Sequence, residues 1–161
     1  MDEKEFLAGL REHQGIIYKV VSMYAADGEE KKDLYQEIVL QCWKGMKQFR
    51  GEARFSTWLY RIAINTVLTL RRKKTALRHA EALTDAGFEP PAVFDREDSQ
   101  QLQAAIRLLS ETDKAMALLF LDGYSIAEMA DMMGISAAHA SVRLYRIKQR
   151  LAKIIHPEQH E

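Results

Sequence analysis

Apolar residues recur three and four positions apart along most of the chain, which is the spacing of one face of an α-helix. The first such pattern covers residues 2–26 and is interrupted at residues 13–15, where we expect a break in the helix. Similar patterns cover residues 29–46 and 55–74, separated from their neighbours by polar turns. This part of the chain is therefore predicted to form a small helical bundle.

The C-terminal part repeats this spacing over four shorter segments, at residues 100–109, 111–121, 126–133 and 137–155. Serines precede three of these segments as N-caps, and glycines end two of them. The capping serines are Ser110, Ser125 and Ser136, and the glycines are Gly123 and Gly134. A short helix, a glycine turn and a longer helix make the helix-turn-helix form. The residues expected in its core are Ile135, Val142, Leu144 and Leu151, with the small Ala130 where two helices cross.

Between these parts, from residue 75 to residue 99, the helical spacing is lost. This stretch contains Gly87, the pair Pro90 and Pro91, and a concentration of acidic residues, which together indicate a linker. We therefore predict an all-α protein with a first domain at 1–76, an acidic linker at 77–99 and a helix-turn-helix domain at 100–161. A helical hairpin with a basic face is the simpler alternative for the last segment.

Composition and charge narrow the possible functions. The chain has 161 residues, 23 basic and 23 acidic, but residues 1–74 carry 14 basic and 10 acidic groups while 75–100 carry 2 and 6. A net charge of zero argues against a protein that binds DNA without a partner. The uneven distribution of charge along the chain suggests two modules and a connector. The acidic N-terminus and the lack of a long apolar run predict a cytoplasmic protein without a signal peptide.

Candidate catalytic chemistry is sparse. No nucleophile–base set, paired carboxylates or glycine-rich phosphate loop is recognisable, so we expect neither an enzyme nor a cofactor. Pro157 lies between His156 and His160 and breaks the helix there, so no metal site is expected. The single Cys42 lies in an apolar helical pattern and is expected to be a buried thiol.

The helix predicted at 55–74 has an unusual outer face, which extends back into the turn before it. Its residues are Arg54, Trp58, Arg61, Asn65, Thr69 and Arg72. No acidic residue occurs between Ala53 and Ala80, so cations on this face can hold phosphates and the aromatic can stack on an unpaired base. Two simpler interpretations stand beside this one. Trp58 can be a core residue, and the basic run at 71–74 can simply match the negative end of the helix dipole.

The amino-acid sequence of this stretch resembles the second conserved region of bacterial sigma factors of the sigma-70 family, in particular the compact extracytoplasmic-function (ECF) group. The matching residues are Phe49, Arg50, Gly51, Glu52, Phe55, Thr57, Trp58, Leu59, Tyr60, Arg61, Ile62, Ala63 and Asn65. The resemblance implies that this loop and helix capture flipped-out bases of the promoter −10 element. The residues it assigns to −10 DNA are Arg50, Arg54, Trp58, Arg61, Asn65, Arg71 and Arg72. Of these, Trp58 would hold the strands apart, Asn65 would line a base pocket, and Arg61, Arg71 and Arg72 would hold phosphates.

The preceding segment, DLYQEIVLQCW, is similar to the family motif of the helix that docks on the clamp helices of the RNA polymerase β′ subunit. The residues carried over as the docking face are Asp33, Gln36, Glu37 and Leu40. Without the resemblance, an acidic and amide face of this kind would more often be simply solvated. Trp43 is compatible with either the core or the docking contact, and we expect it in the core.

The segments YSIAEMADMMGIS and VRLYRIKQRL resemble the family's fourth region, whose recognition helix reads the promoter −35 element. The residues carried over are Ser136, His139, Ser141, Arg143, Tyr145, Arg146 and Lys148. The sequence departs from the family pattern at residues 137–143, and Ser141 stands at a commonly basic position. The base preference at −35 therefore does not follow from the resemblance. Tyr145 and Arg146 become stronger candidates for the residues that contact bases.

The resemblance as a whole implies a dissociable, non-catalytic subunit of bacterial RNA polymerase. Its implied partners are the β′ clamp helices and β flap of the core enzyme, promoter DNA, and an anti-sigma factor that is often membrane-anchored. Two other functions remain open. A stand-alone helix-turn-helix regulator would bind palindromic duplex DNA as a dimer without polymerase, and a structural adaptor or anti-sigma mimic would support no promoter-specific transcription.

Overall fold

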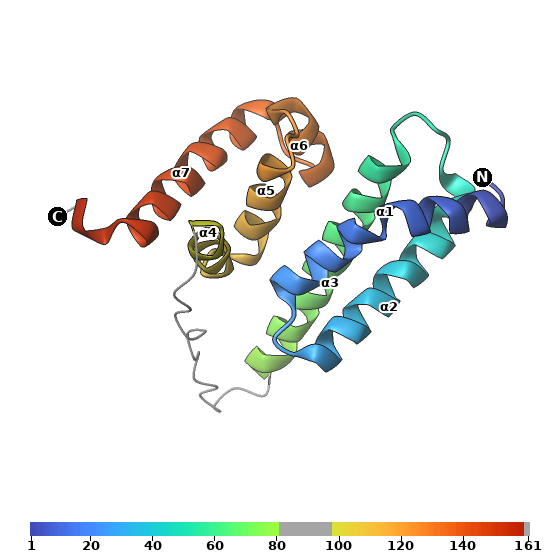
Figure 1. Ribbon diagram of the computed structural model, residues 1–161, viewed down its shortest axis with the longest axis horizontal. Helices are drawn as coiled ribbons and strands as arrows, with labels where there is room; N and C mark the ends of the chain where they lie inside the picture. Colours follow the sequence, from blue (N-terminus) through green and yellow to red (C-terminus); the bar gives the residue numbers. More distant parts are fainter. Residues whose placement is uncertain (81–97, 160–161) are drawn as a thin grey trace. The chain divides into compact units, whose positions relative to one another are not determined.

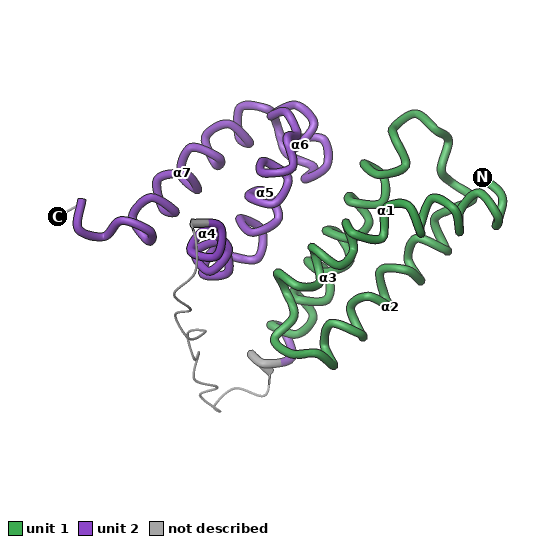
Figure 2. The backbone as a smooth tube through the Cα atoms, viewed as in Figure 1, with its two compact units in different colours: residues 1–75 green, residues 76–161 purple. Residues whose placement is uncertain are grey.

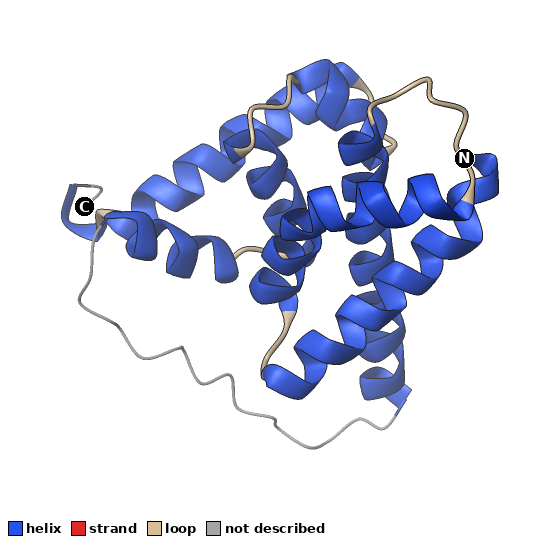
Figure 3. Ribbon diagram, turned by 45° about the vertical axis from the view of Figure 1, so that its right-hand side comes forward, coloured by secondary structure: helices blue, strands red, loops and turns tan. Residues whose placement is uncertain are grey.

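The computed structural model describes residues 1–80 and 98–159, and it divides the chain into two compact units, Met1–Thr75 and Ala76–Glu161 (Figure 2). Within the described ranges every regular element is a helix (Figure 3). The prediction of an all-α fold is therefore confirmed. Most of the predicted linker, residues 81–97, and His160 lie outside the described residues.

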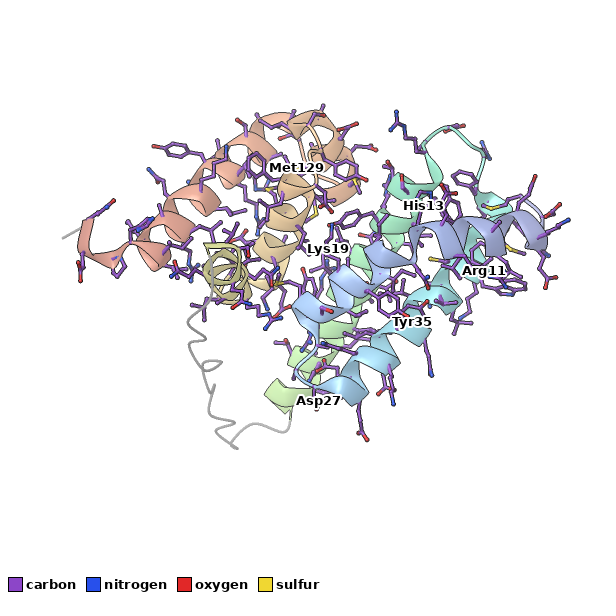
Figure 4. The ribbon with its side chains drawn as sticks, in the orientation of Figure 1. Arg11, His13, Lys19, Asp27, Tyr35 and Met129 are labelled. Atoms are coloured by element: carbon purple, nitrogen blue, oxygen red, sulfur yellow. The ribbon has the colours of Figure 1, made fainter. Side chains whose placement is uncertain are left out.

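Unit 1 consists of α1 (Glu3–Tyr24), α2 (Gly28–Gly45), a single 3₁₀ turn (Met46–Gln48) and the first twenty or so residues of α3 (Phe55–Ala80), packed as a bundle (Figure 1). Its core is apolar and draws on all three helices. The buried side chains include Phe6, Ile17, Val20, Ile38, Leu59, Tyr60, Ile64 and Val67. Tyr18 of α1 also stacks on Tyr35 of α2, with ring centroids 5.1 Å apart, and this pair adds a contact on the bundle surface (Figure 4).

The first helix is continuous, so the predicted break at residues 13–15 is wrong. Gly15 lies in the middle of α1, and a glycine there costs only about 0.5–1 kcal/mol relative to alanine. Burial of Phe6 on one side of it and of Ile17 on the other offsets that cost. A capping box between Asp2 and Glu5 further secures the N-terminus of the helix.

Helix α3 ends at Ala80, six residues beyond the predicted end at Lys74. The basic run at 71–74 therefore does not mark the C-terminus of the helix, and its proposed match to the helix dipole does not hold. Residues 75–80 read TALRHA, a sequence dominated by good helix formers, which explains why the helix continues.

Unit 2 contains α4 (Asp98–Arg107), α5 (Glu111–Leu121), α6 (Ile126–Met133), α7 (Ala137–Ile155) and a final 3₁₀ turn (Pro157–Gln159). The predicted caps are present, since the hydroxyls of Ser110, Ser125 and Ser136 each accept a hydrogen bond from a backbone N–H three residues on. Gly134 adopts the left-handed conformation, with φ of 68°, that the tight turn between α6 and α7 requires.

The core of unit 2 is formed largely by methionine, leucine and alanine. Its buried residues include Ile106, Leu109, Met116, Leu119, Met129, Ala130, Ala140, Leu144 and Ile147 (Met129 is labelled in Figure 4). Ala130 lies between α6 and α7 as predicted. Val142, which was predicted in the core, is 51% exposed instead, and Phe120 of α5 is 39% exposed. Val142 lies on the side of α7 opposite the buried Ala140 and Leu144, so it cannot reach the core.

Candidate nucleic-acid interface

The outer face of α3 lies where the sequence predicts it. Arg61, Asn65, Thr69 and Arg72 are all exposed. The residues on the opposite side of the helix, including Leu59, Ala63 and Val67, are buried in the bundle. A rigid helix therefore presents two cations and an amide side chain in one line, without an acidic residue among them.

Trp58, at the start of this line, is half-buried. Its ring lies 5.2 Å from the ring of Phe49 and 5.4 Å from that of Phe55. A Cβ atom on Gly45 would lie 3.5 Å from Trp58 Cζ2, an ordinary van der Waals distance, so the indole lies close against the backbone of Gly45. Trp58 therefore combines the two alternatives of the sequence analysis, because it is packed by neighbours and still keeps an accessible part.

Trp58 belongs to an aromatic cluster that holds the loop before α3. We use the name aromatic cluster for Phe6, Trp43, Phe49, Phe55 and Trp58. Phe6 of α1 packs edge-on against Trp43 and Phe55, with centroids 5.6 and 6.4 Å apart, and Phe49 packs edge-on against Phe55 at 6.0 Å. Such pairs add about 0.5–1.5 kcal/mol each beyond simple burial. The cluster therefore ties the loop to all three helices of unit 1.

Helix α1 also contributes to this site, which the sequence pattern did not predict. His13 of α1 lies with its ring centroid 5.8 Å from that of Phe55 (Figure 4 labels His13). Gly9, one turn earlier, lies so close to Phe55 that a Cβ atom there would be 2.9 Å from the phenyl ring. The sequence did contain a signal for this contact, because Gly9 lies in the middle of a helical pattern, three residues after Phe6.

The loop at residues 49–54 carries two of the predicted DNA-binding arginines. Arg50 and Arg54 are both exposed, and they flank Gly51, whose φ of 73° lies in the left-handed region. The carbonyl of Arg54 accepts a hydrogen bond of 3.0 Å from the N–H of Trp58, which closes the first turn of α3. The two exposed cations thus belong to the loop that leads directly into α3.

Arg71 lies differently from the other predicted −10 residues. Its Nη2 atom lies 2.7 Å from Glu30 Oε1 and also donates to the carbonyl of Tyr24, and its side chain is 17% exposed. Glu30 also accepts a hydrogen bond of 2.8 Å from the backbone N–H of Ala26, in the turn next to Asp27 (Figure 4). Arg71 therefore fastens α3 to the turn between α1 and α2, and we leave it out of the interface proposed below.

The predicted docking residues gather on one side of α2. Asp33, Gln36 and Leu40 are exposed, while Glu37 is half-buried and accepts a hydrogen bond of 2.7 Å from the amide of Gln41. Trp43, which we expected in the core, is 40% exposed, close to the 43% of Leu40 one turn before it. Trp43 therefore joins this face, while its ring also packs against Phe6.

Helix α7 presents most of the predicted −35 residues to solvent. Among them, His139, Ser141, Tyr145 and Arg146 are exposed, and Ser136 is occupied as the N-cap of the helix. No acidic residue occurs in α7, which carries five lysines and arginines. The helix is thus suited by charge to a phosphate-lined groove.

Two of the predicted −35 residues also hold α7 to α5. Arg143 Nε lies 2.7 Å from Asp113 Oδ1, with both side chains less than one-third exposed. The ammonium group of Lys148 lies 4.4 Å from the centre of the Phe120 ring, a cation–π contact. The backbone N–H of Asp113 donates to the hydroxyl of Ser110, while its carboxylate binds Arg143. These contacts fix the rotation of α7 about its own axis.

The described residues offer little else that points to chemistry. No group of three or more His, Cys, Asp or Glu side chains is placed to hold a metal ion within residues 1–80 and 98–159. Burial raises the pKa of the Cys42 thiol to about 12, so it stays protonated. Among the described helices, none combines the length and apolar character that a bilayer crossing requires.

Both units match known protein families. Residues 10–77 match the family model described as Sigma-70 region 2, and residues 99–151 match Sigma-70, region 4. Among curated proteins, the chain is 30% identical over 153 residues to the ECF RNA polymerase sigma factor SigM of Mycobacterium tuberculosis, covering 90% of this chain and 74% of SigM. It is 26% identical over 171 residues to the ECF RNA polymerase sigma-E factor of Escherichia coli, covering 97% and 89% of the two chains.

Solved structures share the fold. The sigma factor RpoE of Bartonella quintana, in complex with the anti-sigma factor NepR, aligns with a TM-score of 0.76 at 19% identity, over 96% of this chain and 99% of that one. CnrH, in complex with the cytosolic domain of CnrY, aligns with a TM-score of 0.68 at 18% identity, over 98% and 91%. Family models that match in both units, in this order, and relatives along nearly the whole chain lead to one assignment. The chain belongs to the sigma-70 family and is an RNA polymerase sigma factor of the extracytoplasmic-function group.

Proposed function

We propose that this chain binds core RNA polymerase as a dissociable specificity subunit, recognises the −10 and −35 elements of promoters, and opens the DNA for transcription initiation. The observation that carries the proposal is the match of both units to sigma-70 regions in family order. Three exposed faces are available for the three contacts that this function requires. The protein contributes binding energy and positioning and does no catalysis of its own, and it works in the cytoplasm, where polymerase is.

The core polymerase contact is assigned to α2. Asp33, Gln36, Glu37 and Leu40 are the residues expected from the resemblance, and we add Trp43 because it is exposed on the same side. An apolar centre formed by Leu40 and Trp43 with polar groups beside it has the composition of a protein–protein contact. The β′ clamp helices are its expected partner, and the β flap is the expected partner of unit 2.

The −10 contact is assigned to the loop at residues 49–54 and the exposed line of α3. Arg50, Arg54, Arg61 and Arg72 would hold phosphates of the single strand, and Asn65 would hydrogen-bond an unpaired base. The accessible part of Trp58 would stack against the edge of the opened duplex. The aromatic cluster supports this proposal, because it gives the loop a fixed shape before DNA is bound.

The −35 contact is assigned to α7, the second helix of the helix-turn-helix. Its N-terminal turns carry the groups that can enter a major groove, and its lysines and arginines can reach the flanking phosphates. Arg143 and Lys148 act mainly by holding α7 against α5. His139, Ser141, Tyr145 and Arg146 are left as the residues of the predicted set that are exposed and free to face DNA.

An anti-sigma factor completes the proposed set of partners. Two of the solved structures that share this fold are complexes, the sigma factor RpoE with the anti-sigma factor NepR and CnrH with the cytosolic domain of CnrY. A protein that covers α2 or α7 would block polymerase or promoter binding. Such a partner would therefore hold this chain inactive until a signal releases it.

Run-off transcription with core polymerase, with and without this chain, tests the proposal. Promoter-specific transcripts that depend on the chain are expected. The isolated chain should bind duplex promoter DNA only at non-specific levels, with a Kd of about 10⁻⁴ to 10⁻⁶ M at physiological salt. Nanomolar sequence-specific binding without polymerase would instead identify a stand-alone regulator. The relatives are sigma factors, and this favours the polymerase-dependent function.

A further inference from the structure

The outermost line of α7 is uncharged, although the helix as a whole is basic. Ala138, Val142, Tyr145 and Gln149 follow one another at intervals of four, three and four residues, so they share one side of the helix. All four are exposed, Val142 at 51% and Tyr145 at 62%. We call them the uncharged stripe. It lies opposite the buried line formed by Ala140, Leu144 and Ile147.

Val142 is the unexpected member of the stripe. Isolated exposed apolar residues are ordinary on protein surfaces, and one valine would need no explanation. Val142, however, has the methyl group of Ala138 one turn before it and the ring of Tyr145 one turn after it. The amide of Gln149 donates a hydrogen bond of 2.8 Å to the hydroxyl of Tyr145, so the end of the stripe is ordered. The result is a continuous apolar surface along the N-terminal half of a helix-turn-helix second helix.

The charges around the stripe indicate what covers it. His139, Arg146 and Arg150 lie along one side of it, and Lys148 along the other, with no acidic residue anywhere in α7. A narrow apolar line between cations is complementary to the floor of a groove whose rims are phosphates. In the DNA major groove the floor offers one apolar group, the C5-methyl of thymine, which alanine and other small apolar side chains contact.

We propose that Val142, together with Ala138, reads thymine in the −35 element through its C5-methyl group. This inference rests on the proposed function, because it requires α7 to enter the major groove. The first turns of such a helix are the ones that contact base edges. This chain then selects a T·A pair at one or two −35 positions through apolar contact, while Arg146 and its neighbours bind phosphates or guanine.

Deoxyuridine provides the test, because it differs from thymidine only in lacking that methyl group. Holoenzyme is assembled from core polymerase and the full chain, and a promoter library randomised at −35 yields its preferred sequence. Each −35 thymine is then replaced singly by deoxyuridine, and binding is measured. We expect one or two replacements to weaken wild-type binding about fourfold, the effect of one buried methyl group.

Two variants separate the stripe from general effects. Val142→Ala should bind the thymine and deoxyuridine promoters almost equally. Leu121→Ala, which changes an equally exposed (51%) apolar residue on α5, should keep the wild-type fourfold difference. Arg146→Ala should weaken binding to both promoters and also keep the difference, because it leaves the methyl contact in place.

The inference and the proposed function fail in different ways. A preferred −35 sequence without thymine, no deoxyuridine effect in wild type, or an undiminished effect in Val142→Ala would overturn the inference and leave −35 recognition intact. A change from dimer to monomer on Val142→Ala, seen by light scattering, would identify the stripe as a protein interface and also overturn it. Holoenzyme indifferent to the entire −35 element would instead refute the role proposed for unit 2.

Discussion

The phenyl ring of Phe55 occupies the space that a side chain on Gly9 would need. A Cβ atom at Gly9 would lie 2.9 Å from Cε1 of that ring, closer than carbon atoms normally approach. Helix α1 and the first residue of α3 therefore touch backbone to ring, and the ring in turn touches Phe49 and Trp58. The position of the loop at residues 49–54 therefore depends on a glycine that lies more than forty residues earlier in the sequence.

Substitution of Gly9 by alanine should therefore displace Phe55 and disturb the loop. Alanine favours the helix by about 0.5–1 kcal/mol, but overpacking of this kind costs about 1–3 kcal/mol, so we expect a net loss of stability. Promoter opening should also fall, because the loop shifts. Thermal unfolding and permanganate footprinting of the open complex measure the two effects.

Gly15 provides the matched control on the same helix. A Cβ atom there would meet nothing within 4 Å, so Gly15→Ala should stabilise the protein by about 0.5–1 kcal/mol and leave promoter opening unchanged. Equal stabilisation by the two substitutions would show that Phe55 does not press on Gly9.

The Asn65→Ala substitution should impair promoter opening without affecting the fold. Asn65 is exposed on α3, so its removal leaves no cavity. Trp58→Ala, in contrast, removes a half-buried ring packed against Phe49 and Phe55 and should cost about 2–4 kcal/mol of stability as well as opening. A promoter with a pre-melted −10 bubble should rescue Trp58→Ala better than Asn65→Ala. The bubble supplies the strand separation that Trp58 would promote, but it does not replace the base contact of Asn65. Rescue of both to the same degree would argue against a base contact by Asn65.

Charge reversal at Glu37 should weaken binding to core polymerase. The docking face of α2 presents Asp33 and Glu37 beside Leu40, and Glu37→Lys places a cation in a contact expected to be basic on the polymerase side. The Glu12→Lys variant on the exposed surface of α1 makes the same change in net charge and should bind normally. Equal affinities of the two folded variants, measured by fluorescence anisotropy on labelled protein, would rule out this face.

The Arg143→Ala substitution should lower the stability of unit 2 and, through it, promoter binding to all −35 sequences alike. The Arg143–Asp113 pair has a short, well-placed contact, and removing either partner of such a pair costs about 1 kcal/mol. A double-mutant cycle with Asp113→Ala isolates the interaction energy. Additive effects of the two substitutions would mean that the pair contributes nothing and that Arg143 is available for DNA.

The Cys42 thiol should resist alkylation until the protein unfolds. Burial raises its pKa from 9.0 to about 12, so at pH 8 the reactive thiolate is about a thousandfold scarcer than in an ordinary cysteine. Between pH 9 and 12 the unfolded chain releases this proton while the folded chain keeps it. Stability should therefore fall as pH rises through that window and be unaffected by this group below it. Iodoacetamide labelling in native buffer and in urea gives the direct comparison.

The sequence predicted local features well because the interacting groups lie within a few residues of one another. Ser125 caps α6 and Gly134 ends it, as their positions in the sequence indicate. Periodicity likewise predicted the exposed line of α3, since one helix turn determines which residues face outward together.

Contacts between residues that lie far apart in the sequence cannot be predicted from local spacing. Arg71 binds the carbonyl of Tyr24 across 47 positions and Arg143 binds Asp113 across 30, so both arginines looked like free cations in the sequence. The exposure of Val142 was missed for a related reason. Its apolar side chain predicts burial, whereas its angular position on α7 places it opposite the buried Ala140 and Leu144.

The aromatic cluster has a consequence for how this protein can change over generations. Trp43 lies on the proposed docking face of α2, Trp58 lies on the proposed −10 face, and Phe6 and Phe55 join them through ring contacts. Residues in contact respond non-additively to substitution, so a change in one ring alters which changes its neighbours tolerate. The surface proposed to bind polymerase and the surface proposed to bind DNA therefore rest on the same packed aromatic rings. Substitutions that alter one of these surfaces therefore affect the other. Adaptation to a new polymerase partner would have to preserve the geometry of promoter opening at the same time.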